Sequence, residues 1–218
     1  MRTLHLVVLG CALAGTAHAQ SQARGRSGGE GLSLHAGRPL GNDNTTVFIQ
    51  GGWPGITAGM LRGVTDQTDL GGKVAFNYGV EGIVTAVNLG FKAQGMLHVS
   101  LLNQGPFSLG FHFEPGVMTY FIQANTMAAV TLPIRMAAGF AFNSSLVGHF
   151  STELPLYLTF GAGGGAVLPL LFGAGVEYFM GRSFGLLFLT KLGPSFDLRE
   201  NGQTELAFEA LVGVVYRI

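Results

Sequence analysis

A period-two alternation of apolar and polar residues is the feature that most constrains the fold of this chain. In residues Phe107–Gly116, FSLGFHFEPG, phenylalanine and leucine take one set of alternate positions, and serine, glycine, histidine and glutamate take the other. The same alternation recurs in residues 91–102, FKAQGMLHVSLL, and in residues 204–218, TELAFEALVGVVYRI. Successive side chains of a β-strand point to opposite faces. The sequence therefore predicts strands with one apolar and one polar face.

The composition indicates which of these faces meets the surroundings. Hydrophobic residues make up 48% of the chain and charged residues only 11%, which is too little charge for the surface of a water-soluble β-sandwich. No stretch of about 20 residues is uniformly apolar, as a membrane-spanning helix would require. The most hydrophobic region, residues 154–180, contains Pro155, Pro169 and Glu177. These observations favour a transmembrane β-barrel over a soluble sandwich.

The first residues have the organisation of a secretory signal peptide. Arg2 precedes the apolar run LHLVVLGCALAG, and small residues precede the expected cleavage site. We interpret residues 1–19 as a signal peptide and the polar, glycine-rich residues 20–44 as a flexible periplasmic leader. The neighbours of Cys11 resemble a lipoprotein cleavage box, which leaves lipidation as an alternative. Cys11 is the one cysteine of the chain, so its removal would exclude disulfides and thiolate metal sites.

The charge balance bears on possible partners. The chain has 12 Lys and Arg against 12 Asp and Glu, and loss of Arg2 with the signal peptide would leave one more acid than base. Such a chain has no basic field that could hold a polyanion. We therefore expect no nucleic-acid partner.

Ten segments have strand character. We predict that residues 45–218 form one all-β domain, an antiparallel up-and-down transmembrane barrel of about ten strands, with eight or twelve strands as alternatives. The polar segments TDQTD, NQGP, NSS and GRS fall at every second connection, so we expect short turns at one end of the barrel. Aromatic residues near strand ends, among them Tyr78, Tyr120 and Tyr216, are expected at the membrane–water interfaces.

Almost every charge in a predicted strand lies on the face opposite the apolar one. Lysine or arginine facing lipid at the bilayer centre costs roughly 2–4 kcal/mol in such barrels, so the polar face must line the lumen. Acids and bases are balanced on this face, which predicts a neutralising charge network, with lumenal glycines leaving room for water. The predicted network comprises Lys73, Lys92, His98, His112, Glu114, Arg135, His149, Glu153, Glu177, Lys191, Glu205, Glu209 and Arg217.

The carboxyl-terminal residues LVGVVYRI and the strand–turn–strand GVTDQTDLG resemble the small outer-membrane β-barrel proteins of Gram-negative bacteria. In that family an alternating apolar terminus is the assembly signal, and the matching positions here are Val212, Val214, Tyr216 and Ile218. The last residue departs from the pattern, because the family most often ends in phenylalanine. The resemblance implies a bacterial outer-membrane location, contact with outer-membrane lipid, and recognition by the barrel-assembly machinery. It does not identify a substrate.

One constellation has catalytic character. His149 and Ser151 share a strand face with Glu153, and outer-membrane lipid A deacylases resemble the chain in carrying a His-x-Ser pair. Thr152, however, stands where that family has asparagine. The alternation also turns these groups into the lumen and away from lipid, so we predict no catalytic residues.

A second constellation has metal-ligand character. His98 and His112 lie on the two strands of one predicted hairpin and can be cross-strand neighbours inside the lumen. No third ligand is evident in register, so we expect neither a metal nor another cofactor.

The function that follows is non-enzymatic. We predict an outer-membrane barrel that is either a structural or surface-interaction protein or a narrow channel with a charge-paired lumen. An outer-membrane lipid-modifying hydrolase and a small porin remain the alternatives. The identity of a solute or of a surface partner does not follow from these residues.

Overall fold

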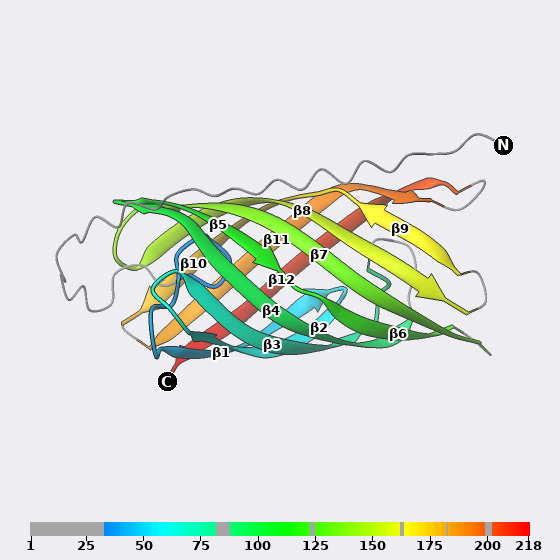
Figure 1. Cartoon of the computed structure of the whole chain (residues 1–218), viewed down its shortest axis with the longest axis horizontal. Coiled ribbons are helices and arrows are strands. Elements are labelled where there is room, and N and C mark those ends of the chain that lie inside the picture. Colours follow the sequence, from blue (N-terminus) through cyan, green and yellow to red (C-terminus); the bar gives the residue numbers. More distant parts are fainter. Residues whose placement is uncertain (1–32, 82–87, 123–124, 162–163, 182, 199–201) are drawn as a thin grey trace, which may run out of the picture.

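The computed structural model describes residues 33–81, 88–122, 125–161, 164–181, 183–198 and 202–218. The predicted signal peptide and residues 20–32 lie outside the described residues. Within these ranges the regular structure is entirely β, as predicted (Figure 1). No helix in the described part of the chain is long and apolar enough to cross a membrane.

The strands run antiparallel and follow the order of the sequence around the sheet. They are β1 (Thr45–Trp53), β2 (Gly55–Gly63), β3 (Thr68–Asn77), β4 (Leu89–Gln104), β5 (Phe107–Phe113), β6 (Gly116–Ile122), β7 (Asn125–Ala141), β8 (Leu146–Phe160), β9 (Gly165–Pro169), β10 (Leu171–Met180), β11 (Phe184–Asp197) and β12 (Thr204–Arg217).

The sheet closes on itself because the first strand pairs with the last. β1 pairs with β2 on one side and with β12 on the other, where Thr46 is opposite Arg217 and Trp53 is opposite Ala210. Closure leaves no free sheet edge, which is the condition for a sheet to span a bilayer. The predicted up-and-down barrel is therefore confirmed.

The twelve strands make ten positions in the barrel wall. β5 and β6 follow one another between β4 and β7, separated by Glu114 and Pro115. β9 and β10 follow one another between β8 and β11, separated by Leu170. Proline has no N–H to donate to a ladder, and each break includes or follows one. The N–H of Leu170 still donates to the carbonyl of Pro194 at 2.8 Å, so the wall stays continuous.

The four predicted short turns lie at one end of the barrel, here called the turn end. They connect β2 to β3, β4 to β5, β7 to β8 and β10 to β11. The start of β1 and Ile218 are at the same end, where the N–H of Ile218 donates to the carbonyl of Thr45 at 2.9 Å. The opposite end, where β1 ends and β2 begins, is called the loop end.

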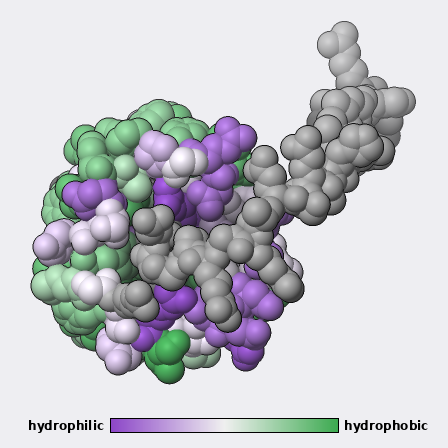
Figure 2. All heavy atoms as spheres, turned by 90° about the vertical axis from the view of Figure 1, so that its left-hand side faces the viewer, coloured by the Kyte–Doolittle hydropathy of each residue, from purple (hydrophilic) through white to green (hydrophobic). Residues whose placement is uncertain are grey.

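Apolar side chains cover the outside of the wall. Val74 and Phe76 of β3 are exposed, whereas Lys73 and Asn77 of the same strand point inward. The predicted assembly-signal residues Val212, Val214 and Tyr216 also share the outer face of β12, and Ile218 is exposed directly after the strand. In a view onto the turn end, hydrophobic residues form the flank and hydrophilic residues gather on the end itself (Figure 2).

One aromatic residue departs from this arrangement. The prediction that Tyr120 lies at a membrane–water interface is wrong, because its side chain is 0% exposed and packs inside the barrel. Tyr120 has the same parity along β5 and β6 as His112 and Glu114, which also point inward. The break at Pro115 does not change that parity, so the strand alternation decides the position of Tyr120 and its aromatic character does not.

Candidate functional site

The lumen collects nearly all the charges that the strands carry. Eleven residues of the predicted network are buried or half-buried inside the wall: Lys73, Lys92, His98, His112, Glu114, Arg135, His149, Glu153, Glu177, Lys191 and Glu209. Glu205 is exposed near the loop end. Arg217 is half-buried at the turn end, where its Nη2 donates to the side-chain oxygen of Asn44.

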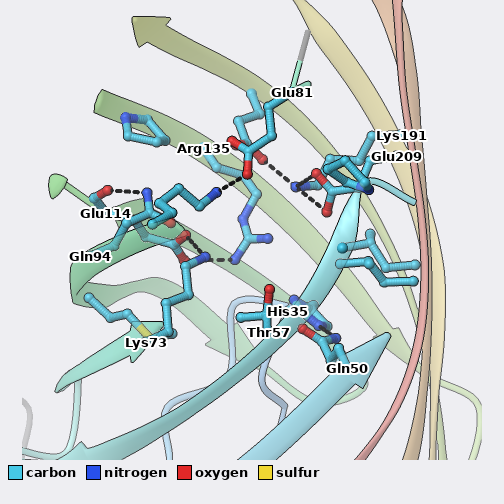
Figure 3. A pocket seen from close by; sticks show the side chains of 18 of the residues that line it. His35, Gln50, Thr57, Lys73, Glu81, Gln94, Glu114, Arg135, Lys191 and Glu209 are labelled. Atoms are coloured by element: carbon cyan, nitrogen blue, oxygen red, sulfur yellow. Dashed lines mark hydrogen bonds and ion pairs between the residues drawn. The ribbon is translucent and has the colours of Figure 1, made fainter. Parts of the chain in front are cut away.

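Glu114, between β5 and β6, is the centre of the first charge cluster (Figure 3). Its carboxylate lies 2.5 Å from Nζ of Lys73, 3.2 Å from Nε2 of His98 and 3.6 Å from Nη2 of Arg135. These groups come from β3, β4 and β7, so the cluster ties together strands that are distant in sequence. A buried carboxylate requires such partners, because the loss of hydration otherwise costs several kcal/mol.

Lys191 of β11 is the centre of the second cluster. Its Nζ lies 2.8 Å from Oε2 of Glu153 and 3.2 Å from Oε1 of Glu209. The lysine side chain is 7% exposed, so both ion pairs are largely shielded from water. In this cluster one cation, Lys191, pairs with two carboxylates. In the first cluster one carboxylate, Glu114, pairs with the two permanent cations Lys73 and Arg135. The two clusters therefore have opposite charge imbalances and lie in the same lumen.

Glu81 forms a third cluster near the loop end, just after β3. Its carboxylate pairs with Nζ of Lys92, accepts a hydrogen bond from Nδ2 of Asn77 at 3.0 Å, and accepts another from the hydroxyl of Tyr157 at 3.1 Å. Burial by itself raises the pKa of Glu81, but the nearby Lys92 charge and the hydrogen bonds from Lys92 and Asn77 outweigh it, so the pKa is lowered from its usual value. The carboxylate is therefore held ionised, and it anchors the chain after β3 inside the loop end.

Two residues of the first cluster, His98 and Glu114, have the spacing of a metal site together with the neighbouring His112. The ligand atoms of His98, His112 and Glu114 all lie within 4.8 Å of one another. However, Nη2 of Arg135 contacts Nδ1 of His112 at 3.0 Å. A guanidinium can only donate, so Nδ1 accepts and the neutral ring carries its proton on Nε2. His112 then has no free lone pair for a metal, and the geometry fits an ion-pair network better than a cation site.

The groups of the His-x-Ser constellation lie inside the lumen but do not engage one another. Both ring nitrogens of His149 and Oγ of Ser151 are buried without a hydrogen-bond partner among the described residues. Glu153, the acid on the same face, is paired with Lys191. A nucleophile, its base and an orienting acid in mutual contact are the arrangement that covalent hydrolysis requires, and these three residues do not form it.

Of the predicted leader the structure describes residues 33–44, and residues 33–40 of these lie inside the turn end, which the composition did not predict. Residues Ser33–Leu40, here called the plug segment, are buried or half-buried throughout. Glu177 of β10 accepts the backbone N–H of Leu34 at 3.2 Å and that of His35 at 2.7 Å. Asp69 of β3 accepts the N–H of Leu40 at 3.1 Å. Two lumenal carboxylates thus satisfy backbone donors that would otherwise be buried unpaired.

Small residues in the wall make room for the plug segment. A side chain at Gly110 of β5 would begin 2.6 Å from Cα of Gly37, and one at Gly139 of β7 would overlap Cβ of Ala36. The glycines predicted to leave room for water include Gly110, which instead admits the backbone of the plug segment. The fit between segment and wall is therefore mutual, with a small residue on each side of the contact.

His35 of the plug segment and His149 of β8 meet inside the lumen. Nε2 of His35 lies 2.7 Å from Nε2 of Gln50 in β1. The ring of His35 also lies against that of His149 in β8, with centroids 5.5 Å apart. Nδ1 of His35 and both ring nitrogens of His149 are buried without a hydrogen-bond partner among the described residues. This region is thus polar in composition and incompletely hydrogen-bonded.

Little free space remains between the plug segment and the loop end. The central cavity is lined by all three charge clusters and by His35, and it has about 60 Å³ for the centres of water molecules. One water needs roughly 10–15 Å³ on this measure, so the cavity holds a few waters. In this conformation the lumen is filled.

Comparison with known proteins finds only low similarity. No protein-family model matches the chain, and no curated protein matches it. Among solved structures, the outer-membrane expressed OmpT of Vibrio cholerae matches with 10% sequence identity and a TM-score of 0.39. The match covers 79% of this chain and 64% of that one, so the chain spans less than two thirds of the length of that structure.

Several residues of the site were not predicted from the sequence. His35, Gln50, Asp69 and Glu81 all point into the lumen, yet His35 and Glu81 lie outside predicted strands and Asp69 belongs to a predicted turn. Asp69 was detectable, because it has the same parity as Lys73 along β3. The positions of His35 and Glu81 depend on how the segments next to the strands fold back, which period-two alternation does not encode.

Proposed function

We propose that this chain is an outer-membrane β-barrel protein of Gram-negative type whose filled lumen serves a structural or surface-interaction role. The observation that carries the proposal is the distribution of polarity across the wall. Val74, Phe150 and Phe172 are 60%, 72% and 57% exposed on the outside, while the ion pairs lie within. Such an outer surface would be insoluble in water, and a hydrocarbon layer is the medium that it suits.

The filled lumen supports a closed barrel over a general porin. Four cations and four carboxylates line the central cavity, so the lumen has no strong net field for either ion sign. The plug segment narrows the turn end, and Glu81 with Tyr120 and Tyr157 narrows the loop end. We therefore expect purified protein in planar bilayers to conduct little, in brief and weakly selective events.

A lipid-modifying activity has less support. The His149 and Ser151 side chains lie within the wall, behind the plug segment, and a lipid in the surrounding layer would have to enter the lumen to reach them. Ser151→Ala tests this directly, because an esterase would lose acyl-chain release from lipid vesicles. We expect the same background release from both proteins.

The proposal is tested by electrophoresis of detergent-solubilised protein before and after boiling. A closed transmembrane barrel resists unfolding in the loading detergent and should migrate differently when it has not been heated. Fractionation of cells that express the full chain should place this heat-modifiable form in the outer membrane. A protein that migrates identically in both samples and is recovered in the soluble fraction would overturn the proposal.

A further inference from the structure

We propose that the loop-end part of β12, residues 204–209, is a docking edge for an extended segment of another protein in which apolar and basic side chains alternate. The inference rests on the proposed surface-interaction role, and it names the surface and the chemistry of the partner. Its first support is the seam. β1 ends at Trp53, opposite Ala210, whereas β12 begins six residues earlier, at Thr204. The seam closes the barrel up to Trp53, and beyond it β12 continues as an overhang (Figure 1).

The β12 overhang, residues 204–209, has a partner strand on one side only. β11 pairs with all of it, as far as Thr204. On the other side no described residue pairs with it: the chain reverses at Pro54 into β2, and after β3 it leads inward to Glu81, which contacts Lys92 and Tyr157. Six residues are about 20 Å of strand. An open strand side of this length exposes alternate backbone N–H and C=O groups, which is the template for strand addition.

Apolar surface continues alongside the β12 overhang. Leu206 is 55% exposed, and Phe208 has the same parity along the strand. Unpaired backbone groups next to a hydrocarbon layer are costly, because lipid offers no hydrogen bonds. A partner strand would supply these bonds, and its own outward side chains would pack against Leu206 and Phe208. The occupant that fits is therefore an extended peptide with apolar residues at alternate positions.

The inward side chains of the β12 overhang determine the charge of the remaining positions. Glu205 is exposed and forms no ion pair with a described residue. Glu209 shares the single cation Lys191 with Glu153, so this part of the wall carries an excess of negative charge. Opposite charges on neighbouring strands stabilise a sheet, and like charges destabilise it. Lysine or arginine at the inward positions of the partner would therefore complement the β12 overhang.

The same acids act against pairing with a second copy of the chain. A copy that paired here with its lumen on the same side would place its own Glu205 and Glu209 on the face of these acids, as opposite or diagonal neighbours. Like charges at such positions destabilise a strand pair, and inward charges are a known protection of strand edges against self-association. The partner that fits is thus a different polypeptide with basic residues at alternate positions.

The experiment uses the folded full-length barrel in a non-ionic detergent and a synthetic peptide that alternates valine and lysine. We expect the peptide to bind and to slow hydrogen exchange at alternate amides of residues 204–209, because alternate N–H groups of a strand point to the same side. Exchange in β11 should not change. A peptide that alternates valine and glutamate should not bind. A valine–lysine peptide with every backbone nitrogen methylated keeps its charge but loses its hydrogen-bond donors, and it should not bind either.

One pair of variants locates the binding site. Glu205→Lys reverses an exposed charge on the β12 overhang, so an attractive cross-strand pair with the valine–lysine peptide becomes repulsive. We expect the affinity to fall about tenfold. Asp66→Lys makes the same change in net charge at an exposed position of the turn end. This matched control should bind the peptide as the unmodified barrel does.

Each other outcome counts against a defined part of the argument. No binding to a barrel that retains heat-modifiable migration would overturn this inference and leave the proposed membrane barrel standing. Equal binding of the methylated peptide, or equal affinities of the two variants, would also overturn it, because charge alone would then hold the peptide. Protection of residues 204–209 in a dimeric sample without peptide would assign the edge to a second copy and reject the basic partner. Absence of the heat-modifiable form before peptide is added would reject the membrane barrel and this inference together.

Discussion

The carboxylate of Glu177 accepts the backbone N–H of His35 at 2.7 Å, across 142 residues of sequence. The contact joins the middle of a barrel strand to a segment that precedes the first strand. It explains why the plug segment, which has no strand character, has a defined place in the lumen. Ordering such a stretch costs conformational entropy, which charge-assisted hydrogen bonds from both ends of the plug segment offset.

The first prediction concerns the fit between the plug segment and the wall. In Gly110→Val the new Cβ would lie 2.6 Å from Cα of Gly37, so the plug segment should be displaced while the strands stay paired. Hydrogen exchange should show loss of protection at Leu34 and Leu40 without loss in β5. The matched control is Gly95→Val, where the new Cβ meets only the carbonyl oxygen of Pro115, at 3.9 Å. Equal protection of the plug segment in both variants would contradict the packing described here.

The second prediction concerns the cluster around Lys191. Lys191→Met would remove the cation between Glu153 and Glu209 and leave two largely buried carboxylates without their partner. Removal of one member of a buried ion pair costs roughly 3–5 kcal/mol, so the midpoint of urea unfolding in detergent should fall. A double variant that adds Glu153→Gln should recover part of the loss. Glu205→Gln, at an exposed position, is the control and should unfold like the unmodified protein.

Strand alternation, together with the oily composition and the polar turn segments, was enough to predict the barrel, the ten wall positions and the short turns. It succeeds because lipid and lumen differ so strongly in polarity that the apolar face of each strand must point to lipid and the polar face to the lumen. Lys73 and Val74 show this clearly, since neighbours in sequence lie on opposite sides of the wall. The partners of each charge did not follow from the alternation. Glu153 pairs with Lys191 across β10, and that pairing depends on strand register and tilt, which the polarity pattern leaves open.

The folding of non-strand segments into the lumen was the larger omission. Glu81 reaches Lys92 and Tyr157 because the chain after β3 turns inward. His35 reaches Gln50 because the plug segment turns back before β1. Neither segment has a periodic pattern, and both are placed by tertiary hydrogen bonds to wall residues. The sequence contains those wall residues, but it does not indicate which segments they bind.

The third prediction tests which face of the wall meets lipid. Val74 is 60% exposed near the middle of β3, so Val74→Arg would place a cation toward the hydrocarbon layer at a cost of roughly 2–4 kcal/mol. The fraction of heat-modifiable protein in the membrane should fall. Val74→Ile keeps the apolar character and should leave that fraction unchanged. Indistinguishable membrane levels of the two variants would mean that this face does not contact lipid.

The last prediction concerns the seam that closes the barrel. Tyr216 is opposite Val47 in β1 and Phe184 in β11, and Arg217 and Ile218 donate backbone hydrogen bonds to Ser183 and Thr45. Deletion of residues 216–218 should remove the turn-end part of this seam and an outward aromatic of the proposed assembly signal. We expect the truncated chain to be absent from the outer membrane and degraded, as judged by immunoblots of fractionated cells. Ile218→Phe preserves the seam and restores the terminal residue most common in the resembling family, so it should reach at least the normal level. Normal membrane levels of the truncated chain would show that assembly requires neither the signal nor this end of the β1–β12 pairing.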